Sequence, residues 1–93
     1  MPRVEWNAAA LADLDRLESF LYSRNPRAAN EAIAAIRAAT RLLSDFPDAG
    51  PIYRDGYRQL SVRFSNSGYL VLYRPNEHAV EIVRIRHMRE DQY

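Results

Sequence analysis

The spacing of hydrophobic residues changes once along this chain, and that change limits the possible folds more than any other feature of the sequence. Between residues 8 and 45, apolar side chains recur every three or four positions, which is typical of amphipathic helices. Between residues 58 and 88, β-branched and aromatic residues alternate with polar ones, which is typical of half-buried strands. Helices followed by strands predict an α+β fold of two layers, with the helices on one face of a small antiparallel sheet.

The first half of the chain is predicted to begin with a short strand and to continue as a helical hairpin. Residues 2–6 (PRVEW) predict the strand, and Asn7 is a suitable N-cap for the helix that follows. The sequence RNP at 24–26 should end this helix and start a second one, because asparagine can cap a helix and proline fits its first position. So short a connection predicts that the two helices pack antiparallel.

Each helix is predicted to turn one apolar stripe toward the sheet. In the first helix this stripe leaves Asp13, Asp15 and Arg16 on the outward face. The two stripes consist of Leu11, Leu14, Leu17 and Leu21 in the first helix and of Ala29, Ile33, Ile36, Thr40 and Leu43 in the second.

The second half is predicted to form a meander of three antiparallel strands after a turn-rich loop at 46–57. The N-terminal strand should pair at one edge of this sheet. The whole chain, 1–93, is then a single domain with the element order β-α-α-β-β-β. The predicted strands are 58–64, 69–74 and 79–88, with turns at 65–68 (SNSG) and 75–78 (PNEH).

Composition excludes several kinds of chemistry. The chain has no cysteine, so it can form neither disulfides nor thiolate metal sites. All 13 basic residues are arginine, whose planar guanidinium suits phosphates and carboxylates but cannot serve as a tuned general base. Only two histidines are present, and no phosphate-binding loop or metal-ligand spacing occurs, so we expect no metal and no cofactor. The N-terminal stretch suggests neither a signal peptide nor a membrane span, and a cytoplasmic location is expected.

The sequence VRIRHMREDQY at 83–93 concentrates charged and aromatic side chains at the end of the last strand. If Val83 and Ile85 face the helices, alternation places Arg84 and Arg86 on the open face of the sheet, within reach of phosphate or carboxylate partners. The alternative is that both arginines are solvated or paired with nearby acids. Those acids would be Glu77 and Glu81.

Four phrases in this order resemble the RelE/ParE superfamily of bacterial toxins from type II toxin–antitoxin modules. They are ALADLDRLESFLYSRNPRAA, LLSDFPDAGP, GYLVLYRPNEHAVEIVRIRH and HMREDQY, and together they extend over most of the chain. The resemblance implies a small toxin that arrests growth. It also implies a cognate antitoxin partner, with which the toxin forms a hetero-oligomer and whose C-terminal segment folds over the toxin surface.

The superfamily contains two mechanisms, and the resemblance implies different site residues for each. ParE-like members poison DNA gyrase, and this branch is preferred because the NPRAA turn and the FPDAGP sequence resemble it. Here the target-binding surface would comprise Arg84, Arg86, His87 and Arg89. A histidine at this place could also simply cap the strand end by bonding to the backbone.

RelE-like members cut messenger RNA on the ribosome, and this metal-free reaction is the alternative function. Arginines would stabilise the phosphorane, while histidine or tyrosine would move protons. The chain has no lysine of the kind that the cutting members use, and Tyr93 stands last, where we expect a frayed end. A second alternative is a non-toxic interaction module or an inactive member. The catalytic residues of the cutting reaction would be His87, Tyr93, Arg58, Arg63 and Arg86.

The antitoxin is expected to place an apolar helix along the helical hairpin and an extended segment over the sheet. Apolar positions of the two helices would then form the docking surface. These positions are Leu14, Leu17, Leu21, Ile33 and Ile36.

Overall fold

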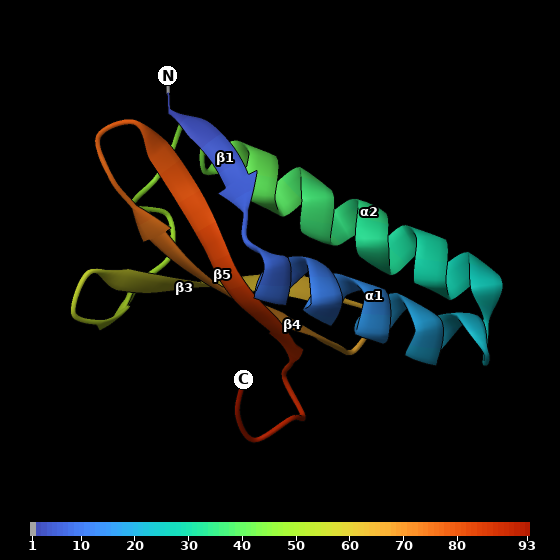
Figure 1. Ribbon diagram of the computed structural model, residues 1–93. Helices are drawn as coiled ribbons and strands as arrows, with labels where there is room; N and C mark the ends of the chain where they lie inside the picture. The colour runs from blue at the N-terminus through green and yellow to red at the C-terminus, as the bar shows by residue number, and fades with distance from the viewer. Residues whose placement is uncertain (1) are drawn as a thin grey trace.

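The computed structural model describes residues 2–93, which form two helices and a five-stranded sheet (Figure 1). The helices pair as an antiparallel hairpin and lie together on one side of the twisted sheet, which confirms the predicted two-layer α+β architecture. The elements are β1 (Arg3–Trp6), α1 (Ala8–Tyr22), α2 (Pro26–Leu42), β2 (Ile52–Arg54), β3 (Tyr57–Phe64), β4 (Ser67–Pro75) and β5 (Ala79–His87).

Both helices begin where the sequence predicts. The Asn7 side chain accepts a hydrogen bond from the backbone N–H of Ala10 at 2.8 Å, and Asn25 accepts one from Ala28 at 3.1 Å. Pro26 occupies the first turn of α2, where the missing N–H has no intrahelical partner in any case. These caps fix the start of each helix and therefore the geometry of the hairpin.

The strand order in the sheet is β1-β5-β4-β3-β2. Strands β2 to β5 form an antiparallel meander, and β1 adds to the far edge parallel to β5, so that the sheet is mixed. Two details differ from the sequence prediction: the parallel pair, and the strand β2, which lies inside the predicted loop 46–57. Alternation carries no information about strand direction, and a strand of three residues is too short to produce a recognisable period.

A β-bulge interrupts the pairing of β4 with β5. Leu72 pairs with Arg84 while the next residue, Tyr73, pairs with Ile82, which leaves Val83 unpaired. Ile82 and Ile85 are consequently both fully buried, although they are three positions apart. Simple two-residue alternation therefore fails at Val83, but it is unbroken from Arg84 to His87.

The core lies between the hairpin and the sheet. In α1 the buried side includes Asp13, which is 4 % exposed, whereas Leu11 is 46 % exposed; the predicted stripe was wrong at both positions. No helix within residues 2–93 is long and apolar enough to cross a membrane. The largest fully buried side chains are Tyr73, Ile36, Leu43, Ile82, Ile85, Val71, Val80 and Thr40.

Candidate functional site

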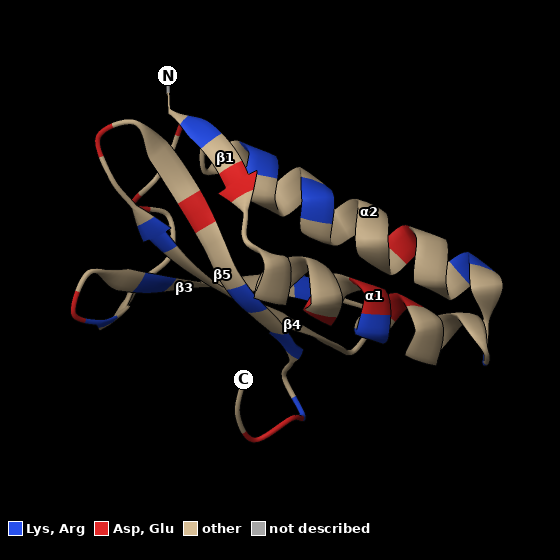
Figure 2. Ribbon diagram, viewed as in Figure 1, with Lys and Arg blue, Asp and Glu red and all other residues tan. Residues whose placement is uncertain are grey.

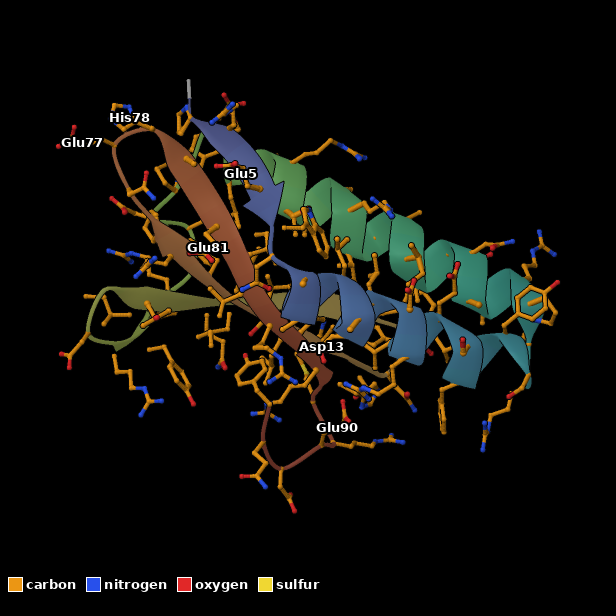
Figure 3. The ribbon with its side chains drawn as sticks, in the orientation of Figure 1. Glu5, Asp13, Glu77, His78, Glu81 and Glu90 are labelled. Atoms are coloured by element: carbon orange, nitrogen blue, oxygen red, sulfur yellow. The ribbon has the colours of Figure 1, made fainter. Side chains whose placement is uncertain are left out.

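Beyond the end of β1, the free edge of β5 is covered by the Asp13 carboxylate of α1. Pairing with β1 stops at Ile82, and from there α1 runs beside β5, with Asp13 between the two elements (Figure 3). One oxygen of Asp13 accepts hydrogen bonds from the Arg84 Nε at 2.7 Å and from the Ile85 backbone N–H at 2.8 Å. The other oxygen accepts from the Arg84 Nη2 at 3.0 Å. Arg84 is thus held in a bidentate ion pair.

This pairing shifts the pKa of Asp13 downward. Burial alone would raise the pKa, but the hydrogen bonds from Arg84 and Ile85 and the charges of Arg84 and Arg16 outweigh burial. The acid partner of Arg84 is therefore Asp13. The sequence had suggested Glu77 or Glu81 as its partner, and this was wrong.

Glu90 binds the next backbone N–H along the same strand edge, that of His87. Its Oε1 accepts from the His87 backbone N–H at 2.8 Å, and its Oε2 lies 2.8 Å from Arg16 Nη1 of α1. Its backbone carbonyl accepts a hydrogen bond from the Arg86 guanidinium. Figure 3 shows Glu90 in the segment that turns back after β5. One residue thereby ties this segment both to α1 and to the sheet.

Tyr93 is packed against the sheet, contrary to the expectation of a frayed end. Its hydroxyl donates to the Gln59 Oε1 at 2.6 Å, and the Arg86 guanidinium lies 5.1 Å from its ring centroid. The Tyr53 ring meets it edge to face, with 6.3 Å between centroids. Burial raises the pKa of Tyr93 to about 12. The phenol therefore remains protonated at neutral pH.

The favourable contacts of Tyr93 are opposed by losses of conformational entropy and of hydration. Cation–π contact is worth about 0.5–2 kcal/mol and an aromatic pair about 0.5–1.5 kcal/mol. Fixing the backbone of one residue costs roughly 1–2 kcal/mol. The buried Nε of Arg86 has no hydrogen-bond partner among the described residues, which adds a desolvation penalty of about 1–3 kcal/mol. These favourable and unfavourable terms are of similar size.

His87 belongs to the helix side of the sheet. Its ring meets that of the buried Tyr69 edge to face, with centroids 5.2 Å apart. Its Nδ1 accepts a hydrogen bond from the Arg89 backbone N–H at 3.0 Å. His87 and Tyr69 line a groove of about 610 Å³ between α1 and the end of β5. The groove is lined by Arg16, Leu17, Phe20, Leu21, Tyr69, His87, Arg89 and Glu90.

Arg58 and Arg63 do not lie together. Arg58 donates to the carbonyl of Gly50 at 2.8 Å and pairs with Asp48 at 3.4 Å, so it holds the loop before β2. Arg63 is exposed on β3, opposite Gly68.

The five residues predicted for RNA cleavage are divided between the two faces of the sheet. Residues directly opposite in an antiparallel ladder share a face. His87 pairs with Tyr69 and Arg58 with Tyr73, and both tyrosines point into the core. Alternation places Arg63 and Arg86 on the opposite, open face, where Tyr93 joins Arg86.

The residues predicted to dock an antitoxin are mostly internal. Leu14, Leu17 and Ile36 are at most 5 % exposed, and of these three only Leu17 lines the groove beside α1. Leu21 and Ile33 are partly buried against the core. The large apolar side chains that α1 does expose are Leu11, Phe20 and Tyr22.

Sequence reasoning missed the structural role of three polar residues, Asp13, Gln59 and Glu90. Asp13 lies three positions after Ala10 and four before Leu17, and both of these are buried. A stripe centred on Ala10 would have placed this acid on the inner face. The sequence around Gln59 and Glu90 carried no comparable signal.

Neither sign of charge predominates on the helices or on β5 (Figure 2). Acidic and basic residues are interspersed over both helices and β5 (Figure 2). The net charge is +1. Within residues 2–93 no group of three or more acidic or histidine side chains is arranged to hold a metal ion.

Comparison with known proteins identifies the family. Residues 4–92 match the family model described as the ParE toxin of the type II toxin–antitoxin system parDE. The chain belongs to the ParE toxin family. Among curated proteins, this toxin is 38 % identical to Toxin RelE3 of Caulobacter vibrioides over 90 residues, covering 97 % of this chain and 98 % of the relative. Toxin RelE1 of the same organism is 32 % identical, with 89 % of each chain covered.

Solved structures support the fold of the toxin. A chain of the structure described as the chromosomal ParDE TA system from P. aeruginosa superimposes with a TM-score of 0.79 at 24 % identity, covering 94 % of this chain and 96 % of that one. The conserved hypothetical protein HP0894 from Helicobacter pylori gives a TM-score of 0.57 at 19 % identity, covering 97 % and 98 %. These structures show the fold, while the family match makes the chain a toxin of a type II toxin–antitoxin system, which implies an antitoxin partner.

Proposed function

We propose that this toxin arrests growth by binding and poisoning DNA gyrase and not by cutting RNA. The observation that carries the proposal is the division of the five candidate cleavage residues between two faces of the sheet. Metal-free cleavage needs its proton-transfer and charge-stabilising groups around one phosphate. His87 faces the groove beside α1, whereas Arg86 and Tyr93 lie on the open face.

The state of Tyr93 supports the same proposal. A general acid or base is most effective when its pKa lies near the working pH, and burial raises the pKa of Tyr93 to about 12. Its hydroxyl is also engaged with Gln59. In this conformation the phenol is a packing group.

Ribosome-dependent RNA cleavage remains the second candidate because Arg86 and Tyr93 are adjacent on the open face. Induction of the toxin without antitoxin distinguishes the two functions. Under the gyrase proposal, primer extension finds intact messages, and purified toxin inhibits supercoiling by purified gyrase. Codon-position cleavage of ribosome-bound messages with unaffected gyrase would overturn it in favour of cleavage. Unimpaired growth on induction would leave only the non-toxic alternative.

We further propose that the antitoxin helix docks in the groove beside α1. The groove combines apolar Phe20 and Leu21 with the charged side chains of Arg16, Arg89 and Glu90. Phe20 is 57 % exposed and carries the Arg24 guanidinium 3.9 Å from its ring centroid. An exposed aromatic residue in a groove is a typical binding hot spot.

Replacing Phe20 with aspartate should weaken antitoxin binding by at least about tenfold without loss of the fold, because an apolar contact is exchanged for a charge. Leu42→Asp is the matched control, since Leu42 is equally exposed but lies at the end of α2, at the other end of the hairpin. Rescue of growth by co-expression of the small open reading frame beside the toxin gene provides the measurement. Equal rescue of both variants would place the antitoxin elsewhere.

A further inference from the structure

We propose that residues 88–93 form a strap that covers Arg86 on the open face of the sheet, and that Glu90 links the closing of this strap to the groove beside α1. The link between the strap and the groove uses only contacts within the chain. Its effect on toxicity rests on the function proposed above, because Arg86 belongs to the predicted target-binding surface.

On the open face, the Arg86 guanidinium contacts the strap. The guanidinium donates to the carbonyl of Glu90 and lies against the ring of Tyr93. Tyr93 is in turn held from β3 by Gln59 and from β2 by Tyr53. The strap thus occupies the position that any partner of the Arg86 guanidinium would need.

The closed strap leaves Arg86 incompletely satisfied. Its Nε is buried without a hydrogen-bond partner among residues 2–93. Opening the strap would return this N–H to water or to an acceptor from a partner, whereas the closed form loses that hydrogen bond. An anionic partner therefore gains a donor that the strap does not use.

On the groove side, Glu90 connects the strap to α1. Its carboxylate bridges Arg16 of α1 and the backbone N–H of His87, and all three residues line the groove. The Glu90 side chain thus responds to what binds in the groove, while its backbone carbonyl holds Arg86 on the open face. A carboxylate that binds Arg16 from the groove would compete with Glu90 and loosen the strap. The two faces of the sheet are coupled through this residue.

Site-resolved modification of arginines with p-hydroxyphenylglyoxal tests the strap on the purified full chain. In the unmodified sequence, Arg86 should react about tenfold more slowly than the exposed Arg89, because local closing protects it. Tyr93→Ala and Glu90→Ala should each raise the rate at Arg86 by at least about fivefold. Asp91→Ala, an exposed acid within the same segment, is the control and should leave the rate unchanged. Equal rates at Arg86 and Arg89, or no response to Tyr93→Ala and Glu90→Ala, would refute the strap.

A second pair of variants tests the linkage. Arg16→Ala should raise the rate at Arg86 by about two- to threefold, since Glu90 loses its partner on α1 but keeps the His87 N–H. Arg27→Ala, which breaks the exposed Arg27–Glu31 pair of α2, is the matched control. If the two variants react alike, the linkage is refuted. Supercoiling inhibition is measured separately, so a protected Arg86 in a toxin that leaves gyrase unaffected would overturn the proposed function alone.

Discussion

Replacing Asp13 with alanine is expected to lower the free energy of unfolding by about 3 kcal/mol, because it leaves the Arg84 guanidinium and the buried Ile85 N–H without their acceptor. For a domain of this length, such a change corresponds to a fall in Tm of at least about 12 °C. Urea and thermal unfolding followed by circular dichroism provide the measurement. Asp15→Ala removes an exposed acid from the outer face of the same helix and should change the free energy by no more than about 0.5 kcal/mol.

The Asp13 contribution should also depend on pH. The pKa of Asp13 in the folded protein lies below its ordinary value of 3.8, so its stabilising effect is complete well above pH 4. The effect is lost as the pH falls through the lowered pKa, where the carboxylate must take up a proton. Asp13→Asn should therefore flatten the fall in stability between about pH 5 and pH 2. Identical pH profiles for the variant and the unmodified chain would contradict the assignment.

Replacing Tyr73 with phenylalanine is expected to have the next largest effect, a loss of about 2–3 kcal/mol. The Tyr73 hydroxyl donates to the carbonyl of Pro47 at 2.7 Å and accepts from the Gly50 N–H at 2.9 Å. Phenylalanine keeps the ring but removes the only hydrogen-bond partner described for these two backbone groups, and the burial of the ring prevents water from replacing it.

The loop before β2 should loosen together with this loss of stability, because the same hydroxyl fixes it beside the contacts of Arg58. Faster amide hydrogen exchange at Gly50 would provide the local measurement. Tyr22→Phe is the matched control, since Tyr22 is 57 % exposed and should tolerate the change. A loss confined to global stability, with unchanged exchange at Gly50, would show that the hydroxyl does not hold this loop.

The fold could be predicted from the sequence because its main signals are local. Asn7, Asn25 and Pro26 mark the helix starts by their own hydrogen-bonding and dihedral properties. Period-two runs located the three long strands. The direction of β1 and the existence of β2 depend on contacts between distant parts of the chain, and no local pattern encodes such contacts.

The candidate site was less predictable because its contacts join distant parts of the chain. Alternation holds from Arg84 to His87, so the faces of these residues follow from the sequence, but their hydrogen-bond partners do not. The guanidinium of Arg84 is then bound by an acid 71 residues earlier in the chain. The roles proposed for His87 and Arg86 in toxicity remain predictions, because their target is not part of this chain.

The carboxylates of Asp13 and Glu90 also cover a part of the sheet edge at which two copies of the toxin could otherwise pair. They occupy the two outward amides of β5 beyond β1, those of Ile85 and His87, where an additional strand would otherwise pair. At neutral pH this part of the edge therefore resists edge-to-edge aggregation and strand exchange. As the pH falls through the lowered pKa of Asp13, this carboxylate loses its charge and the protection at Ile85 weakens, so edge-to-edge association of the purified toxin should increase in acid.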